Sequence, residues 1–141
     1  MGATVNNSSG FSVIGKPEEI KRISRRIRPF RHAYIKLIKP ASTLTWEYVN
    51  NINEFGDTFI TQVSDGTGSY GITFDVGFFK NPTNVIQDVS IIHSTTSNIV
   101  ITASFTNDTK SNLNINVFDI TLSSTTDVLG EILVVIREFY E

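Results

Sequence analysis

The chain has 141 residues, 40% of them hydrophobic, and a formal net charge of −2. This length suits one domain with a sizeable core and is too short for two ordinary domains. Because the sequence contains no cysteine, disulfide frameworks, thiolate metal sites and cysteine nucleophiles are excluded.

The first 15 residues are rich in Asn, Ser and Gly and show no hydrophobic periodicity. We interpret them as flexible in the isolated chain, and not as a secretory signal, because no apolar stretch follows a positive charge. No later stretch approaches the roughly 20 apolar residues of a membrane-spanning helix. The sequence therefore predicts a soluble protein made in a cytoplasm, with no membrane partner.

Residues 16–28, KPEEIKRISRRIR, are the only segment with helical periodicity. Pro17 suits the first helical position, and Pro29 ends the predicted helix. The apolar stripe is only three isoleucines wide, which makes the helix marginal without a partner. We expect it to dock on a protein; phosphate binding by its arginines or a solvated charged face are the alternatives. The expected docking residues are Ile20, Ile23, Ile27, Arg22, Arg25, Arg26 and Arg28.

Charge is divided unevenly along the chain. Residues 1–40 contain nine basic and two acidic residues, a net charge of +7, and residues 41–141 carry −9. This division predicts a basic N-terminal arm on an acidic body. We assign the arm to residues 1–30, flexible over 1–15 and helical over 16–28, and a β-sandwich domain to residues 31–141.

After Pro29, the periodic segments alternate with a period of two. They are rich in Ile, Val, Phe and Thr and are separated by Asn, Asp, Gly and Ser, as expected for strands and turns. The pattern predicts an all-β fold, an antiparallel, jelly-roll-like β-sandwich of about eight strands. The predicted strands are residues 32–39, 45–50, 58–63, 69–76, 84–92, 98–105, 113–120 and 131–140.

The stretch SDGTGSYGITFDVGFF, residues 64–79, combines a glycine-rich loop with a strand. We predict a hairpin loop at SDGTGS, because glycine supplies the positive φ angles of tight turns. Asp65 fits an Asx-type turn, with a calcium site as the alternative. Gly71 and Gly77 are expected on the face of the strand opposite Tyr70, and the Phe78-Phe79 pair is expected to cap one end of the core.

The last predicted strand contains the unbroken apolar run 132–136. A strand buried on one face alternates, so this run predicts cover on both faces. The cover is either a second subunit or the two sides of a central strand within one domain. For the first alternative, the oligomer interface comprises Ile132, Val134, Ile136 and Phe139.

No set of residues forms a recognisable catalytic motif. His32 and His93 lack a carboxylate or second histidine at ligand spacing, and no nucleophile elbow or phosphate-binding loop is present. The sequence therefore predicts a non-enzymatic protein with no metal and no cofactor. Trp46, Tyr48 and Tyr70 are candidates for an aromatic platform that binds glycans, with core packing as the alternative.

Residues 33–79 resemble a small β-sandwich module of virion proteins of tailed phages, notably crAss-like and other Bacteroidetes phages. A strand with Tyr34-Ile35 is followed by residues 53–60 around Gly56, and then by a hairpin of the form G-x-G-x-Y-x-(I/V)-x-F. The hairpin residues that carry the resemblance are Gly66, Gly68, Tyr70, Ile72 and Phe74.

The resemblance implies a structural or adhesion protein of the virus particle, often a homotrimer: a head fibre, a capsid decoration protein or a fibre-attachment domain. The expected partners are further copies of the chain and other virion proteins such as the capsid protein. A carbohydrate- or host-receptor-binding module is the alternative. A weaker alternative is a nucleic-acid-packaging accessory that uses Arg22, Arg25, Arg26 and Arg28.

Overall fold

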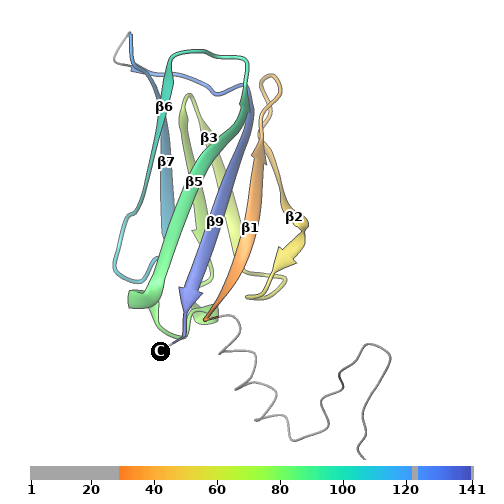
Figure 1. Ribbon diagram of the computed structural model, residues 1–141, viewed down its shortest axis with the longest axis vertical. Helices are drawn as coiled ribbons and strands as arrows, with labels where there is room; N and C mark the ends of the chain where they lie inside the picture. Colours follow the sequence, from red (N-terminus) through yellow and green to blue (C-terminus); the bar gives the residue numbers. More distant parts are fainter. Residues whose placement is uncertain (1–28, 122–123, 141) are drawn as a thin grey trace, which may run out of the picture.

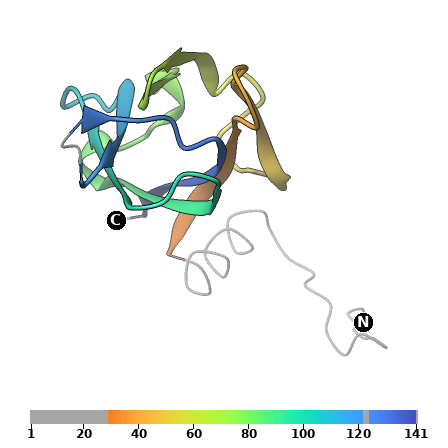
Figure 2. The same cartoon turned by 90° about the horizontal axis from the view of Figure 1, so that it is seen from above.

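The computed structural model describes residues 29–121 and 124–140. These residues form two antiparallel β-sheets packed face to face (Figure 1), so the predicted all-β sandwich is confirmed. Viewed along the strands, the two layers enclose the core between them (Figure 2). The predicted helix and its docking residues lie outside the described residues.

Each of the eight predicted strands is present, although the boundaries differ by a few residues. The four-stranded sheet has the order β2 (Thr45–Asn53), β1 (Phe30–Ile38), β9 (Gly130–Phe139) and β5 (Val85–Ser94). The five-stranded sheet has the order β3 (Ile60–Gly66), β4 (Ser69–Phe74), β7 (Asn112–Asp119) and β6 (Ile99–Phe105), and the short β8 (Ser124–Thr125) pairs with the end of β7. Two 3₁₀ turns, η1 (Val76–Phe78) and η2 (Pro82–Asn84), lie between β4 and β5.

The connectivity differs from the jelly roll expected, in which successive strands mostly cross from one sheet to the other. Here β1 and β2, β3 and β4, and β6 and β7 pair as neighbours within one sheet. The connection between β3 and β4 is only two residues long, and such a turn joins antiparallel neighbours. The first and last long strands, β1 and β9, are also neighbours and pair along their whole lengths.

The core forms because alternate residues of the strands point between the sheets. On the four-stranded side, Ala33, Ile35 and Leu37 of β1 pair in register with Ile136, Val134 and Ile132 of β9. On the five-stranded side, the buried positions are Tyr70, Ile72 and Phe74 of β4 and Leu113, Ile115 and Val117 of β7.

Phenylalanines close one end of this core. Phe59 stacks on Phe55 at 4.4 Å and on Phe74 at 4.8 Å between ring centroids, and Phe79 meets Phe59 edge-on at 5.4 Å. Phe79 is buried and Phe78 packs against the cluster. The prediction that the Phe78-Phe79 pair caps the core is confirmed.

Local irregularities interrupt the alternation of two strands. The register of β3 shifts between Ile60 and Gln62, so Thr61 is exposed although Phe59, two residues before it, is buried. The strand expected to continue to residue 76 ends at Phe74, because the Asp75 side chain accepts a hydrogen bond from the Gly77 amide and begins η1. Gly77 therefore lies in a turn and not on the strand face.

Gly68 fixes the β3–β4 hairpin. Its φ is +66°, and a Cβ at this position would lie 2.5 Å from the Thr126 carbonyl oxygen. The Gly68 amide donates to Asp127 Oδ1 at 2.9 Å, and its carbonyl accepts from the Val117 amide at 2.8 Å. Glycine is needed both for the left-handed conformation and for this close approach.

Candidate functional site

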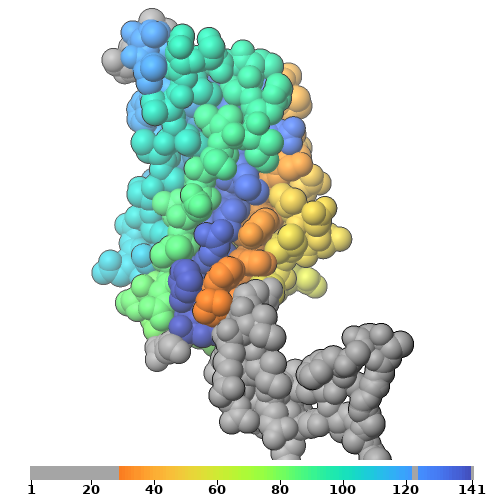
Figure 3. Space-filling model, in the orientation of Figure 1, coloured from red at the N-terminus to blue at the C-terminus, as the bar shows by residue number. Residues whose placement is uncertain are grey.

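The outer face of the four-stranded sheet is the surface that stands out by its apolar character. Ile132, Val134 and Ile136 of β9 are almost completely buried and point at the opposite sheet. The intervening Leu133 and Val135 therefore point to the outside, where β9 runs between β5 and β1 (Figure 3). Both faces of β9 are apolar, and on the outer face Val135 is only 6% exposed and Leu133 is half-buried, so the domain itself already covers much of that face.

Neighbouring strands extend this apolar surface. In the register of the sheet, Val135 lies between Tyr34 of β1 and Asp88 of β5, and Leu133 lies between Lys36 and Ser90. Ile86 of β5 is 45% exposed, and Phe139 at the end of β9 is also exposed. We call the outward residues Tyr34, Ile86, Leu133, Val135 and Phe139 the outer strip.

Aromatic rings gather at the end of the outer strip where the described chain begins. Phe30 lies 5.5 Å from Phe139 and 5.4 Å from His32, and His32 lies 4.8 Å from Tyr34, all measured between ring centroids. The Arg137 guanidinium lies 5.5 Å from the Phe30 ring centre. The first described residues thus lead directly onto this surface.

The structure corrects the predicted oligomer interface. Ile132, Val134 and Ile136 cannot contact a second subunit, because they fill the core of their own domain. Phe139 is the only one of the four predicted residues that is exposed. Even-numbered residues of this strand point inside and Leu133 and Val135 point outside, yet Val135 is also buried and Leu133 half-buried. Because β9 lies between β1 and β5, this cover agrees with the alternative of a central strand within one domain.

The predicted aromatic platform is not assembled. Tyr70 is only 2% exposed and lies in the core, which agrees with the core-packing alternative and removes it from the candidates for a glycan surface. Trp46 and Tyr48 do lie together on β2, with their rings edge to face at 5.3 Å, and Trp46 is 37% exposed. Burial raises the pKa of Tyr48.

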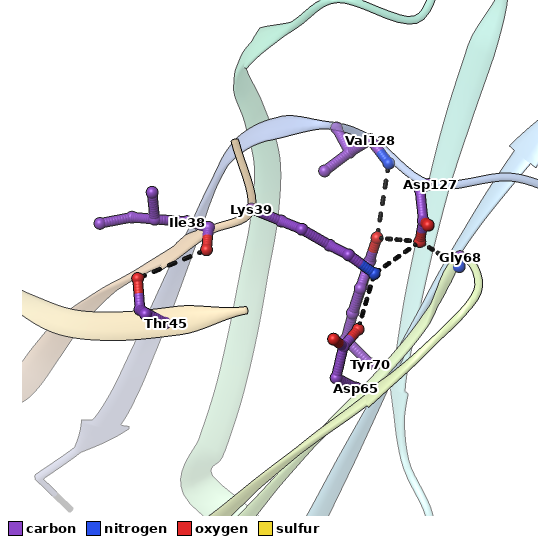
Figure 4. A network of polar contacts seen from close by, with 8 residues as sticks. All are labelled: Ile38, Lys39, Thr45, Asp65, Gly68, Tyr70, Asp127 and Val128. Atoms are coloured by element: carbon purple, nitrogen blue, oxygen red, sulfur yellow. Dashed lines mark hydrogen bonds and ion pairs between the residues drawn. The ribbon is translucent and has the colours of Figure 1, made fainter. Parts of the chain in front are cut away.

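A buried polar network joins the two sheets at the end of the sandwich where β1 ends (Figure 4). Lys39 is 5% exposed, and its Nζ donates to Asp65 Oδ1 at 2.9 Å and to Asp127 Oδ1 at 3.0 Å. The Tyr70 hydroxyl donates to the same Asp127 oxygen at 2.9 Å and accepts from the Val128 amide at 3.4 Å. Asp65 thus has an internal cation as its partner.

At neutral pH, Lys39 and Tyr70 are protonated and Asp127 is ionised. Burial works against the charge of Lys39, but hydrogen bonds to Asp65 and Asp127 outweigh it and raise the pKa of Lys39. Burial also opposes the charge of Asp127, yet hydrogen bonds from the Gly68 amide, Lys39 and Tyr70 lower its pKa. Burial raises the pKa of Tyr70 to about 12. Lys39 follows β1 of the four-stranded sheet, whereas Asp65 and Tyr70 belong to β3 and β4 of the five-stranded sheet, so this network fastens the sheets together.

A second ion pair lies at the opposite end of β1. Arg31 Nε donates to Glu138 Oε1 at 2.8 Å, and Glu138 Oε2 accepts from the Asn81 amide at 2.7 Å. The Arg31 guanidinium also donates to the Phe78 carbonyl and lies 4.7 Å from the Phe55 ring centre. Glu138 is buried, so this pair ties the β1–β9 edge to the phenylalanine cluster.

The inward position of Arg31, Lys39 and Glu138 was not predicted, although their spacing in the sequence indicates it. Arg31 and Lys39 have the same parity as the inward-facing Ala33, Ile35 and Leu37, and Glu138 has that of Ile132 to Ile136. In the sequence, Arg31 and Lys39 contribute to the net charge of +7 of residues 1–40. Both are neutralised inside the domain.

Comparisons with known proteins give no relative, since no family model, curated protein or solved structure matches the chain. Within residues 29–121 and 124–140, no group of three or more His, Cys, Asp or Glu side chains could hold a metal ion. No helix in this part of the chain is long and apolar enough to cross a membrane.

Proposed function

We propose that the protein is a non-enzymatic structural protein of a phage particle, a head fibre, capsid decoration or fibre-attachment protein, that self-associates through the outer strip as a trimer. The observation that supports the self-association is the exposed apolar surface beside the outer side of β9, where Ile86 is 45% exposed and Phe139 is also exposed. Subunit interfaces bury apolar surface of this kind. The virion setting rests on the resemblance of residues 33–79 to phage modules.

The charge distribution supports a docking role for the N-terminal arm. Of the basic residues in 1–40, Arg31, Lys36 and Lys39 form ion pairs with acidic residues of their own domain. Residues 1–28 retain six basic and two acidic residues, whereas residues 29–140 contain six basic and eleven acidic ones. A basic arm therefore meets an acidic body, either on a neighbouring copy or on another virion protein such as the capsid protein.

Two measurements test this function. Light scattering of the purified full chain should give three times the monomer mass, and a monomer at micromolar concentration would contradict self-association. A chain that lacks residues 1–30 should keep its β-sheet circular dichroism and its oligomeric mass but fail to enter particles. Normal incorporation of the shortened chain would contradict the arm as the docking element.

A further inference from the structure

The outer face of the five-stranded sheet differs in chemistry from the outer strip. Alternation and register define which side chains of β3, β4, β6 and β7 point outward there. Most of them are amides and hydroxyls, the apolar exceptions being Val100 and Phe118 at one end, and none carries a charge. The polar ones are Gln62, Ser64, Ser69, Thr73, Thr102, Ser104, Asn112, Asn114 and Asn116.

These side chains form rows across the sheet. Asn114 of β7 is flanked by Gly71 of β4 and Ser104 of β6, and Asn116 is flanked by Ser69 and Thr102. Rows lie two residues apart along a strand, a spacing of about 7 Å, and strands lie about 4.8 Å apart. The result is a regular array of polar groups on a backbone fixed by sheet hydrogen bonds.

The centre of the array keeps its hydrogen-bonding capacity. At one end, the Thr73 hydroxyl donates to Asn112 Oδ1 at 2.9 Å, so these two side chains satisfy each other. The side-chain amides of Asn114 and Asn116 make no such bond within the described residues, and Asn114 is exposed. Each amide therefore offers an acceptor and two donors outward.

Gly71 makes room for a neighbouring side chain at the middle of the array. Ser64 Oγ lies 2.5 Å and Asn114 Oδ1 3.9 Å from the position that a Cβ of residue 71 would occupy. The Ser64 hydroxyl of β3 therefore occupies the space over the β4 backbone, with the Asn114 amide of β7 on the other side. A glycine within a strand permits such a close approach.

We propose that this face, centred on Gly71, Asn114 and Asn116, binds a neutral glycan. Sugar hydroxyls both donate and accept hydrogen bonds. Side-chain amides and hydroxyls can do the same, so they can pair with either function of a sugar hydroxyl. A face without charge gives no attraction to phosphate, sulfate or uronic acid groups. Protein partners are less suited, because protein interfaces are enriched in aromatic residues, Met and Arg and depleted in Ser.

The proposal goes beyond the structural role and does not depend on it. Self-association through the outer strip uses the four-stranded sheet and leaves the five-stranded sheet facing solvent. The proposed glycan-binding face also lies on a different sheet from the aromatic pair Trp46 and Tyr48 of β2. Trp46 therefore serves as an internal control.

Isothermal titration of the full-length protein tests the proposal with neutral hexasaccharides, namely maltohexaose, cellohexaose and mannohexaose, and with an acidic hexagalacturonate. At least one neutral sugar should bind with a dissociation constant of about 1 mM or lower, and the acidic sugar should not. Binding of no neutral sugar, or equal binding of the acidic one, would overturn the proposal.

Variants locate the site. Asn114→Ala combined with Asn116→Ala should weaken neutral-sugar binding about tenfold or more, as expected for the loss of several hydrogen bonds. Thr102→Lys with Ser104→Lys provides a second, independent block of the same face. Trp46→Ala should leave the affinity unchanged. Loss of binding in Trp46→Ala with retention in both face variants would overturn the assignment, whatever the oligomeric mass of the protein.

Discussion

Lys39 and Asp127 lie 88 residues apart in the sequence and are joined by an ion pair of 3.0 Å between Nζ and Oδ1. Lys39 follows β1 of the four-stranded sheet, and Asp127 precedes β9 after the chain has left the five-stranded sheet. The Asp127 oxygen also accepts from Gly68 and Tyr70 at the other sheet. One carboxylate thus ties both layers together at this end of the sandwich.

Lys39→Met should lower the free energy of unfolding by about 2 kcal/mol, because it leaves Asp65 and Asp127 close together without their cation. The loss is smaller than for a fully buried pair, since both carboxylates retain some contact with water. Urea denaturation followed by circular dichroism measures the change.

Lys36→Met is the matched control on the same strand. Lys36 Nζ lies 3.3 Å from Glu131 and 4.0 Å from Glu47, but these pairs lie on the outer face. Surface pairs contribute less than about 1 kcal/mol. Equal losses in the two variants would show that the Lys39 network contributes no more than a surface ion pair.

Comparison of Tyr70→Phe with the wild-type protein should reveal how ionisation of the Tyr70 hydroxyl at alkaline pH affects stability. The pKa of Tyr70 is raised from 10.0 to about 12, so its contribution to stability is complete below pH 10 and is lost as pH rises towards 12. The variant should be about 1 kcal/mol less stable at pH 7 through loss of a buried hydrogen bond. The difference between the two proteins should narrow above pH 10 in urea titrations. A difference that stays constant from pH 7 to 11.5 would argue against the raised pKa.

Gly68→Ala should destabilise the domain by about 2 kcal/mol or more, because alanine is strained at a φ of +66° and its Cβ would meet the Thr126 backbone. Gly77→Ala is the control, since its nearest neighbour is the Asp75 carboxylate at 3.1 Å, the end of a side chain that can move. Thermal unfolding compares them. Similar melting temperatures for both variants would contradict the role assigned to Gly68.

The strands could be predicted because their alternation reflects which side faces the core. Ala33, Ile35 and Leu37 share a face in the sequence and in the structure. The positions of the bulges cannot be predicted from this alternation. On β2, Asn50 and Asn51 both adopt positive φ and shift the register between Ala33 and Ile35. The order of strands within the sheets depends on long-range pairing, which local patterns do not encode.

The candidate site was predicted only in part. The unbroken run of β9 indicated cover on both faces, but the assignment of inside and outside required the register with β1 and β5. For Tyr70 both a glycan platform and core packing stayed open, because aromatic composition does not distinguish a core ring from an exposed one. The polar face centred on Asn114 escaped notice because neutral side chains on a solvated sheet face give no local signal.

Paired lysine substitutions test whether subunits meet through the outer strip. Ile86 is 45% exposed on the four-stranded sheet and Val100 is 43% exposed on the five-stranded sheet. A lysine at either position should be tolerated by the fold, but only Ile86→Lys places a charge in the proposed interface. Light scattering should therefore give a trimer for the wild-type protein and for Val100→Lys, and a monomer for Ile86→Lys. A wild-type monomer, or an Ile86→Lys protein that keeps the wild-type mass, would contradict the account.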